Sequence, residues 1–188
     1  MAHHLAVLNI GRLAAPLDDP RLADFVACLP AINGLADRAP GFVWRLVGED
    51  GDDATSVRPF GDDVIINLTV WESIESLRDY TYRSDHLEPM RRRREYFVPY
   101  GSAYLVLWWV PAGHLPSVPE AAERLAHLDA HGPSGHAFTF RQPMPAPGEA
   151  KGEPEARAPG GGSPGPAPDR GPAQPEPSTA RAGSARSA

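Results

Sequence analysis

The side chains that could do chemistry gather in one stretch, residues 64–97, which reads VIINLTVWESIESLRDYTYRSDHLEPMRRRREYF. His86 is the leading catalytic candidate, because a neutral imidazole acts as acid or base near neutral pH and also binds iron. The competing interpretation is a helix-cap or surface histidine, hydrogen-bonded to Asp85 or to a backbone carbonyl. The residue types in this stretch predict a pocket but do not indicate which reaction takes place in it.

Four consecutive arginines, residues 91–94, belong to the same stretch. Guanidinium groups bind carboxylates and phosphates through paired hydrogen bonds, so they could hold an acidic substrate or haem propionates. Four consecutive helical residues point in all directions, and Arg91 and Arg94, three apart, share a face. They are the predicted pair. For at least two of the four, a solvated turn paired with Glu88 and Glu95 is the favoured interpretation.

Two asparagines, Asn9 and Asn67, are polar members of otherwise apolar predicted strands. If the first and third strands are neighbours, the two amides meet on one face and could orient a substrate. The alternative is that a neighbouring backbone group satisfies each amide. Trp71 and Tyr82 could contribute to an aromatic cavity, although core packing or a dimer interface explains most aromatic residues better. The other aromatic residues considered for this cavity are Trp44, Tyr80, Tyr104 and Trp108.

Metal binding is not predicted. His127 and His131 stand four residues apart on the last predicted helix and could share a face, but no third ligand is evident in the sequence and there is no HExxH pattern. His3 and His4 could bind adventitious metal. Cys28 is the single cysteine, which excludes an intrachain disulfide, and its apolar helical surroundings predict a buried, inert thiol.

The elements that position these residues follow from hydrophobic periodicity. Strands are predicted at residues 5–10, 42–47, 64–70 and 104–110, and helices at 20–36, 74–82, around 91–94 and at 118–131. This order predicts a ferredoxin-like βαββαβ domain of the α+β class with an extra C-terminal helix. Helices would cover one face of the sheet. Because the strands are apolar on both faces, the other face must be buried as well, and packing against a second copy of the chain is the predicted solution. A homodimer is therefore expected.

Composition divides the 188 residues into a domain, 1–142, and a tail, 143–188. The tail has no Leu, Ile, Val, Phe, Tyr or Trp and holds eleven of the 22 prolines, so it is predicted to be disordered. Its charges cancel, which leaves the net charge of −6 on the domain and argues against nucleic acid and anionic lipid as partners. No apolar run approaches the ~18 residues of a membrane span, and a soluble cytoplasmic protein is expected.

Several segments resemble a bacterial family of unknown function: GFVWRL at 41–46, NLTVWES at 67–73, residues 86–97, LWWVPAGH at 107–114, and the HGP…AFTF ending at 131–140. That family is similar to the dimeric α+β barrel superfamily, which includes antibiotic-biosynthesis and haem-degrading monooxygenases. The resemblance covers roughly residues 4–143 and implies the fold. It assigns no catalytic residue.

Together these observations predict a small-molecule enzyme of the monooxygenase-like type that acts on an aromatic or polycyclic substrate with no dedicated cofactor or with haem. The alternatives are a non-catalytic ligand-binding or dimerisation module, and a structural protein whose polar strand residues only satisfy backbone groups.

Overall fold

The computed structural model describes residues 2–49, 51, 53–83 and 92–148. Two candidate residues, His86 and Arg91, lie outside these ranges, as does the chain from residue 149 onward. Within the described ranges, none of the helices has both the length and the apolar character needed to cross a bilayer.

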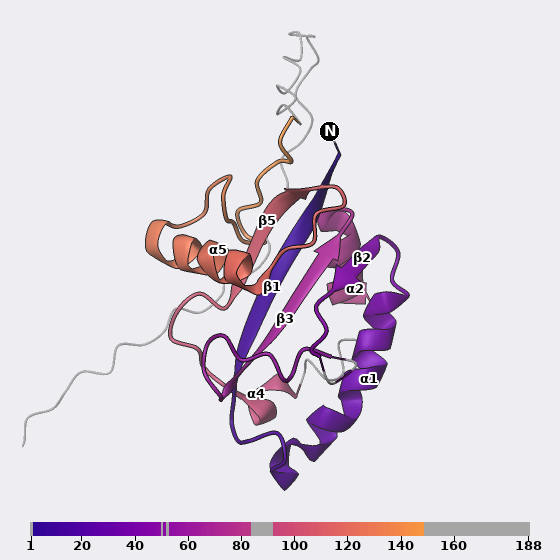
Figure 1. Cartoon of the computed structure of the whole chain (residues 1–188), viewed down its shortest axis with the longest axis vertical. Coiled ribbons are helices and arrows are strands. Elements are labelled where there is room, and N and C mark those ends of the chain that lie inside the picture. Colours follow the sequence, from indigo (N-terminus) through magenta and orange to yellow (C-terminus); the bar gives the residue numbers. More distant parts are fainter. Residues whose placement is uncertain (1, 50, 52, 84–91, 149–188) are drawn as a thin grey trace, which may run out of the picture. The chain divides into compact units, whose positions relative to one another are not determined.

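One antiparallel sheet forms the centre of the domain (Figure 1). Its long strands run in the order β2-β3-β1-β5, and a short β4 pairs with the end of β1 beyond β5. The strands are β1 (His3–Leu13), β2 (Phe42–Arg45), β3 (Val64–Trp71), β4 (Phe97–Val98) and β5 (Leu105–Pro111). With α1 between β1 and β2, and α2 between β3 and β5, this is the predicted ferredoxin-like α+β arrangement.

The helices begin where the sequence places capping residues. They are the 3-10 turn η1 (Pro20–Leu22), α1 (Ala23–Asp37), α2 (Ile74–Arg83), α4 (Arg93–Tyr96) and α5 (Val118–His131). The Asp19 carboxylate accepts from the Arg21 N–H at 2.9 Å, and the hydroxyls of Ser73 and Ser117 accept from backbone N–H groups three residues on. An interior proline favours a kink or a restart of a helix, but α1 continues through Pro30 as one helix.

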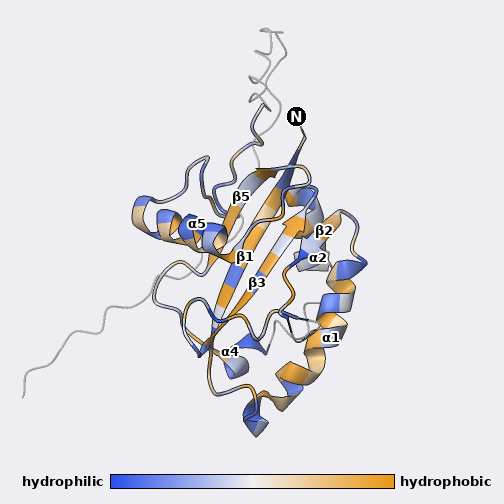
Figure 2. Cartoon of the chain, in the orientation of Figure 1, coloured by the Kyte–Doolittle hydropathy of each residue, from blue (hydrophilic) through white to orange (hydrophobic). Residues whose placement is uncertain are grey.

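The two faces of the sheet carry different helices. On the face that we call the α1/α2 face, strand residues pack against Ile74 and Leu77 of α2 and against Phe25 and Leu29 of α1. On the opposite face, called the α5 face, they pack against Leu125 and other residues of α5. Figure 2 shows that the strands between these helices are largely apolar.

The prediction of a bare second sheet face is wrong. Ala121, Leu125 and Leu128 of α5 cover part of it, and a further part is covered by Ala54, Val57 and Phe60 from the connection between β2 and β3. The strand residues beneath them are at most 5% exposed within a single chain. The sequence argument for a homodimer, which relied on an uncovered sheet face, therefore no longer holds. The homodimer stays a prediction that rests on the family resemblance.

Strand β2 departs from the predicted alternation. Alternation along residues 42–47 predicts Phe42, Trp44 and Leu46 on one face, but Phe42 packs on the α1/α2 face while Trp44 and Leu46 pack on the α5 face. A register shift between Phe42 and Trp44, which pair with Trp71 and Val70, explains the difference. The extra residue of a bulge moves the side chains that follow it to the other face.

Core contacts continue past residue 142. The Trp109 indole N–H donates to the Met144 carbonyl oxygen at 2.8 Å, Met144 packs against the α1/α2-face core, and Ala146 is buried. Residues 143–148, which the sequence assigns to the tail, thus lie against the sheet.

A chain that ends at Gly148 should keep the free energy of unfolding of the full chain within about 1 kcal/mol, because the removed residues have no large apolar side chain. A chain that ends at Gln142 should lose about 1–3 kcal/mol, since the Trp109 N–H loses its acceptor and Ala146 its burial. Urea unfolding followed by tryptophan fluorescence measures both. Equal stability of the two truncations would contradict the contribution assigned to residues 143–148.

Candidate functional site

The two predicted asparagines meet at the centre of the sheet. Asn9 of β1 and Asn67 of β3 are direct cross-strand partners, as the sequence predicted for adjacent first and third strands. Directly opposed residues of an antiparallel pair point to the same side of the sheet. Their side is the α1/α2 face, because Val7 and Trp71, an even number of residues away, belong to the core there.

The amide pair interrupts the apolar core on that face. On one side of it, Val7 and Trp71 belong to a cluster with α2. On the other side, Leu13 and Ile65 belong to a separate cluster with η1 and α1. Asn67 is exposed between these clusters, although both of its strand neighbours and most of the strand are buried. A polar row between two apolar surfaces is the arrangement expected where a flat ligand with polar edges binds.

Among the described residues, much of the hydrogen-bonding capacity of the Asn9 and Asn67 side chains is unused. Asn9 Nδ2 donates to the Tyr104 carbonyl oxygen across a long 3.4 Å, and that oxygen already accepts from the Ile10 N–H at 2.8 Å. Among the described residues, no hydrogen-bond partner is seen for the Asn67 side chain. The backbone interpretation therefore fits Asn9 in part and does not fit Asn67.

Glycine at position 11 is required for the packing beside the pair. A Cβ on Gly11 would lie 2.7 Å from Cε1 of Phe97, so only glycine lets this ring approach β1. Phe97 in turn packs edge-on against Phe25 of α1, with ring centroids 5.3 Å apart. The aromatic side chains of Phe97 and Phe25 thereby close the end of β1 next to the amide pair.

The arginines of α4 divide into different roles. Arg92 is engaged: its guanidinium lies 3.1 Å from Asp24 and 2.9 Å from Glu95, and hydrogen bonds to Glu95 and then Asp24 raise its pKa. Because Asp24 belongs to α1, Arg92 joins α4 to that helix. Arg93 lies over the ring of Tyr104, 5.9 Å from its centroid, next to the carbonyl that Asn9 contacts. Arg94 is exposed and stays a predicted ligand for an acidic group.

The predicted aromatic residues are placed differently from one another. Trp71 is buried in the core, where its indole N–H donates to Thr69 Oγ1 at 3.0 Å and its ring lies 5.0 Å from that of Tyr80. Tyr82 is 63% exposed on α2. Trp108 and Trp109 point to opposite faces, as their adjacency in a strand predicts.

Tyr80 carries a measurable electrostatic signature. Burial, and secondarily the charge of Asp37, raises its pKa from 10 to about 12. Since the folded protein holds this proton more tightly than the unfolded chain, the associated stability is present below pH 10 and is lost between pH 10 and 12. We expect the free energy of unfolding to fall across that interval by at most about 3 kcal/mol. Tyr80→Phe should flatten this part of the pH profile, whereas Tyr82→Phe, a control on the same helix, should not.

Sequence reasoning passed over one polar residue of α1. Asn33 is half-buried and stands four residues after Leu29 and three before Ala36, on the side of α1 that packs inward. The spacing of Asn33 from Leu29 and Ala36 is the sequence signal that places it on this inward side of the helix. The following glycine, Gly34, favours an irregularity at this point, but α1 continues through both residues.

Two clefts occur elsewhere in the described part of the chain. One, of about 600 Å³, lies between the start of α2, Trp109 and residues 143–148. The other, of about 320 Å³, lies between the end of α1 and α2, beside Tyr80. Neither is lined by Asn9, which is half-buried, or by Asn67, which is exposed.

A family model supplies the identity that geometry alone does not. The model described as a domain of unknown function (DUF3291) matches residues 4–154, most of the chain. The chain belongs to this family. The match begins just before Leu5 and includes both asparagines, the arginine stretch and residues 143–148, so the site lies within the DUF3291 domain. No curated protein matches the sequence.

Solved structures similar to the DUF3291 domain differ in what they do. SnoaB, a cofactor-independent oxygenase from Streptomyces nogalater, is 19% identical with a TM-score of 0.41, over 62% of this chain and 100% of its own. A hydroxynitrile lyase from Passiflora edulis is 12% identical with a TM-score of 0.38, over 61% and 98%. A conserved protein from Methanosarcina mazei is 14% identical with a TM-score of 0.40, over 57% and 90%. At these values no activity transfers to this chain.

Proposed function

We propose that the DUF3291 domain binds a planar aromatic molecule across Asn9 and Asn67 and oxygenates it without a dedicated cofactor. The observation that carries this proposal is the opposed amide pair interrupting the core of the α1/α2 face. An asparagine in an apolar strand contributes less to packing than a leucine would. Its presence at both opposed positions is explained by a ligand whose polar edge needs these amides.

The chemistry suited to such a site begins with an acidic carbon or hydroxyl of the substrate. Two amide N–H groups stabilise the oxyanion that forms when the substrate loses a proton. The substrate anion then supplies the electrons: a ring CH2 group and one O2 give a ring carbonyl and one water, so the two hydrogens lost leave in that water. No external reductant is needed for this balance.

Residues outside the amide pair have assigned parts in this proposal. His86 is the proposed base that takes the substrate proton. This role rests on the sequence alone, because His86 lies outside the described residues. Arg94, together with Arg91, is proposed to hold an acidic group of the substrate. Trp71 and Tyr82 are proposed substrate contacts from the sequence; in the structure Trp71 is buried and packs against Phe42 and Tyr80.

The test uses substituted anthrones as probes, because each has the ring CH2 group that this reaction converts. We expect saturable binding, seen as quenching of tryptophan fluorescence, followed in air by one O2 consumed per carbonyl formed. Product should not form under argon. Failure of every such probe to bind would overturn the proposed site.

A non-catalytic binding module is the second candidate. It is favoured by one observation: among the described residues, no titratable side chain is in hydrogen-bond contact with Asn9 or Asn67. In the experiment above, this candidate predicts saturable binding without oxygen uptake.

Haem is the alternative cofactor, and His86 is its proposed ligand. Titration of the full chain and of His86→Ala with haem, followed by absorbance, distinguishes the two cases. A saturable Soret shift that disappears in His86→Ala would replace the cofactor-free proposal with a haem-dependent one. No shift in either protein is the expected result.

A further inference from the structure

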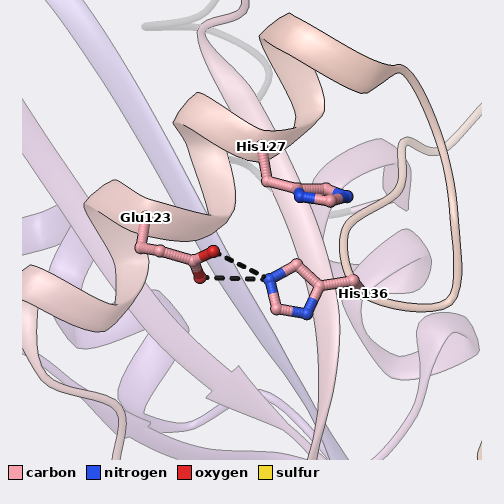
Figure 3. Close-up of side chains that lie close together, drawn as sticks. All are labelled: Glu123, His127 and His136. Atoms are coloured by element: carbon pink, nitrogen blue, oxygen red, sulfur yellow. Dashed lines mark hydrogen bonds and ion pairs between the residues drawn. The ribbon is translucent and has the colours of Figure 1, made fainter.

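A second polar cluster lies on the other side of the sheet from the amide pair. Glu123 and His127 are one turn apart on α5, and His136 stands in the segment that follows this helix. Figure 3 shows the side chains of Glu123 and His127 directed from the helix toward the His136 ring. The sequence paired His127 with His131, whereas the fold brings Glu123 and His136 to His127.

The backbone explains why His136 arrives there. Gly132 ends α5 with a positive φ of 74°, and its N–H donates to the Leu128 carbonyl at 2.9 Å, which turns the chain back along the helix. Two residues after His136, Phe138 is fully buried and exchanges backbone hydrogen bonds of 2.8 and 2.9 Å with Leu107 of β5. His136 is thus held between a helix end and a strand.

The donor atoms lie close together. His136 Nε2 is 3.0 and 3.1 Å from the two carboxylate oxygens of Glu123. The rings of His127 and His136 have centroids 4.5 Å apart, and one potential ligand atom from each of the three residues lies within 4.8 Å of the others. Tetrahedral ligands about 2.1 Å from an ion are roughly 3.4 Å apart, so only small side-chain rotations are needed.

We propose that Glu123, His127 and His136 bind one divalent transition-metal ion of the Zn²⁺ class. Two imidazoles and one carboxylate form a donor set that suits Zn²⁺ and its neighbours, whereas Ca²⁺ and Mg²⁺ prefer oxygen ligands alone. Three protein ligands leave a fourth position for water. The His131 ring, with its centroid 4.7 Å from that of His127, is the nearest further imidazole.

Arg124 works against the ion. Its Nη1 lies 2.5 Å from His136 Nδ1 and 2.8 Å from the His136 carbonyl oxygen. Because arginine only donates, Nδ1 accepts this hydrogen bond and the proton of the neutral ring sits on Nε2, facing Glu123. Ligation through Nε2 moves that proton to Nδ1 and leaves Arg124 with the carbonyl.

The proposed ion would join α5 to the segment that leads into Phe138, and so fasten the layer that covers the α5 face. This role is independent of the oxygenation proposed for the amide pair, which lies on the opposite face. Failure of one proposal therefore leaves the other intact.

Titration of the full chain with Co²⁺ and with Zn²⁺ alone tests the proposal. We expect one ion per chain, a visible absorption band of tetrahedral Co²⁺ that Zn²⁺ removes, and a raised midpoint of thermal unfolding. His127→Ala and His136→Ala should each weaken binding by more than about tenfold. Arg124→Leu should bind the ion more tightly, since it frees Nδ1 of His136.

Matched controls come from histidines outside the cluster. His114, which contacts Glu120 at 2.8 Å, and His3 at the start of β1 are replaced by alanine, and both variants should bind the ion as the full chain does. Binding that disappears in either control but survives in His127→Ala and His136→Ala would overturn the proposal, as would the absence of saturable binding. Weaker binding by Arg124→Leu would contradict ligation through Nε2.

Discussion

Trp108→Ala should lower the free energy of unfolding by about 3–5 kcal/mol, the largest stability effect that we expect from a single substitution. Trp108 is 0% exposed in the α5-face core, so its removal leaves a cavity that the strands cannot close. Its indole N–H also donates to Glu120 Oε1 at 3.0 Å, which ties β5 to the first turn of α5. Equilibrium urea unfolding, followed by far-UV circular dichroism, measures the change.

The neighbouring tryptophan is the control for this prediction. Trp109 is half-buried on the opposite face, and Trp109→Ala should cost clearly less than Trp108→Ala because part of its surface already contacts water. Trp108→Phe should recover most of the loss, leaving about 1 kcal/mol for the missing hydrogen bond. If Trp109→Ala proved the more destabilising of the two alanine substitutions, the α5 face would not be the better-packed core described above.

Asn67→Leu should abolish the proposed activity while leaving the protein at least as stable as before. Loss of a donor to a developing oxyanion lowers kcat by about 10²–10³. In the folded protein, however, the Asn67 side chain has no hydrogen-bond partner among the described residues, and a leucine would join the two apolar clusters beside it. We expect a change in the free energy of unfolding between zero and about +1 kcal/mol. Oxygen uptake with the aromatic probe and urea unfolding measure the two effects on one sample.

Asn9→Leu and Gln142→Leu make the comparison quantitative. Asn9→Leu removes the weak bond to the Tyr104 carbonyl, so it should lower activity comparably but give less stability, or none. Gln142→Leu changes an exposed amide outside the strands and should leave activity unchanged. A structural protein predicts the reverse pattern, in which both strand substitutions destabilise by more than about 1 kcal/mol and ligand binding is unaffected.

Local sequence signals were reliable in the central strands and at the helix starts. Alternation along residues 64–70 predicted which side chains share a face of β3, and Asp19, Ser73 and Ser117 marked the helix starts. The meeting of Asn9 and Asn67 followed from the element order, because βαββαβ topology makes the first and third strands neighbours. Each of these signals repeats with the period of the backbone or depends on residues close in sequence.

What the sequence by itself determined was therefore the fold class, the faces of the central strands and the meeting of Asn9 with Asn67. Tertiary structure alone decided the rest. The bulge after Phe42, the cover of the second sheet face by α5, the packing of Met144 on Trp109 and the approach of His136 to Glu123 all depend on contacts between distant segments. Such contacts depend on how side chains pack and on where the chain turns. Neither of these appears as a periodic pattern in the local sequence.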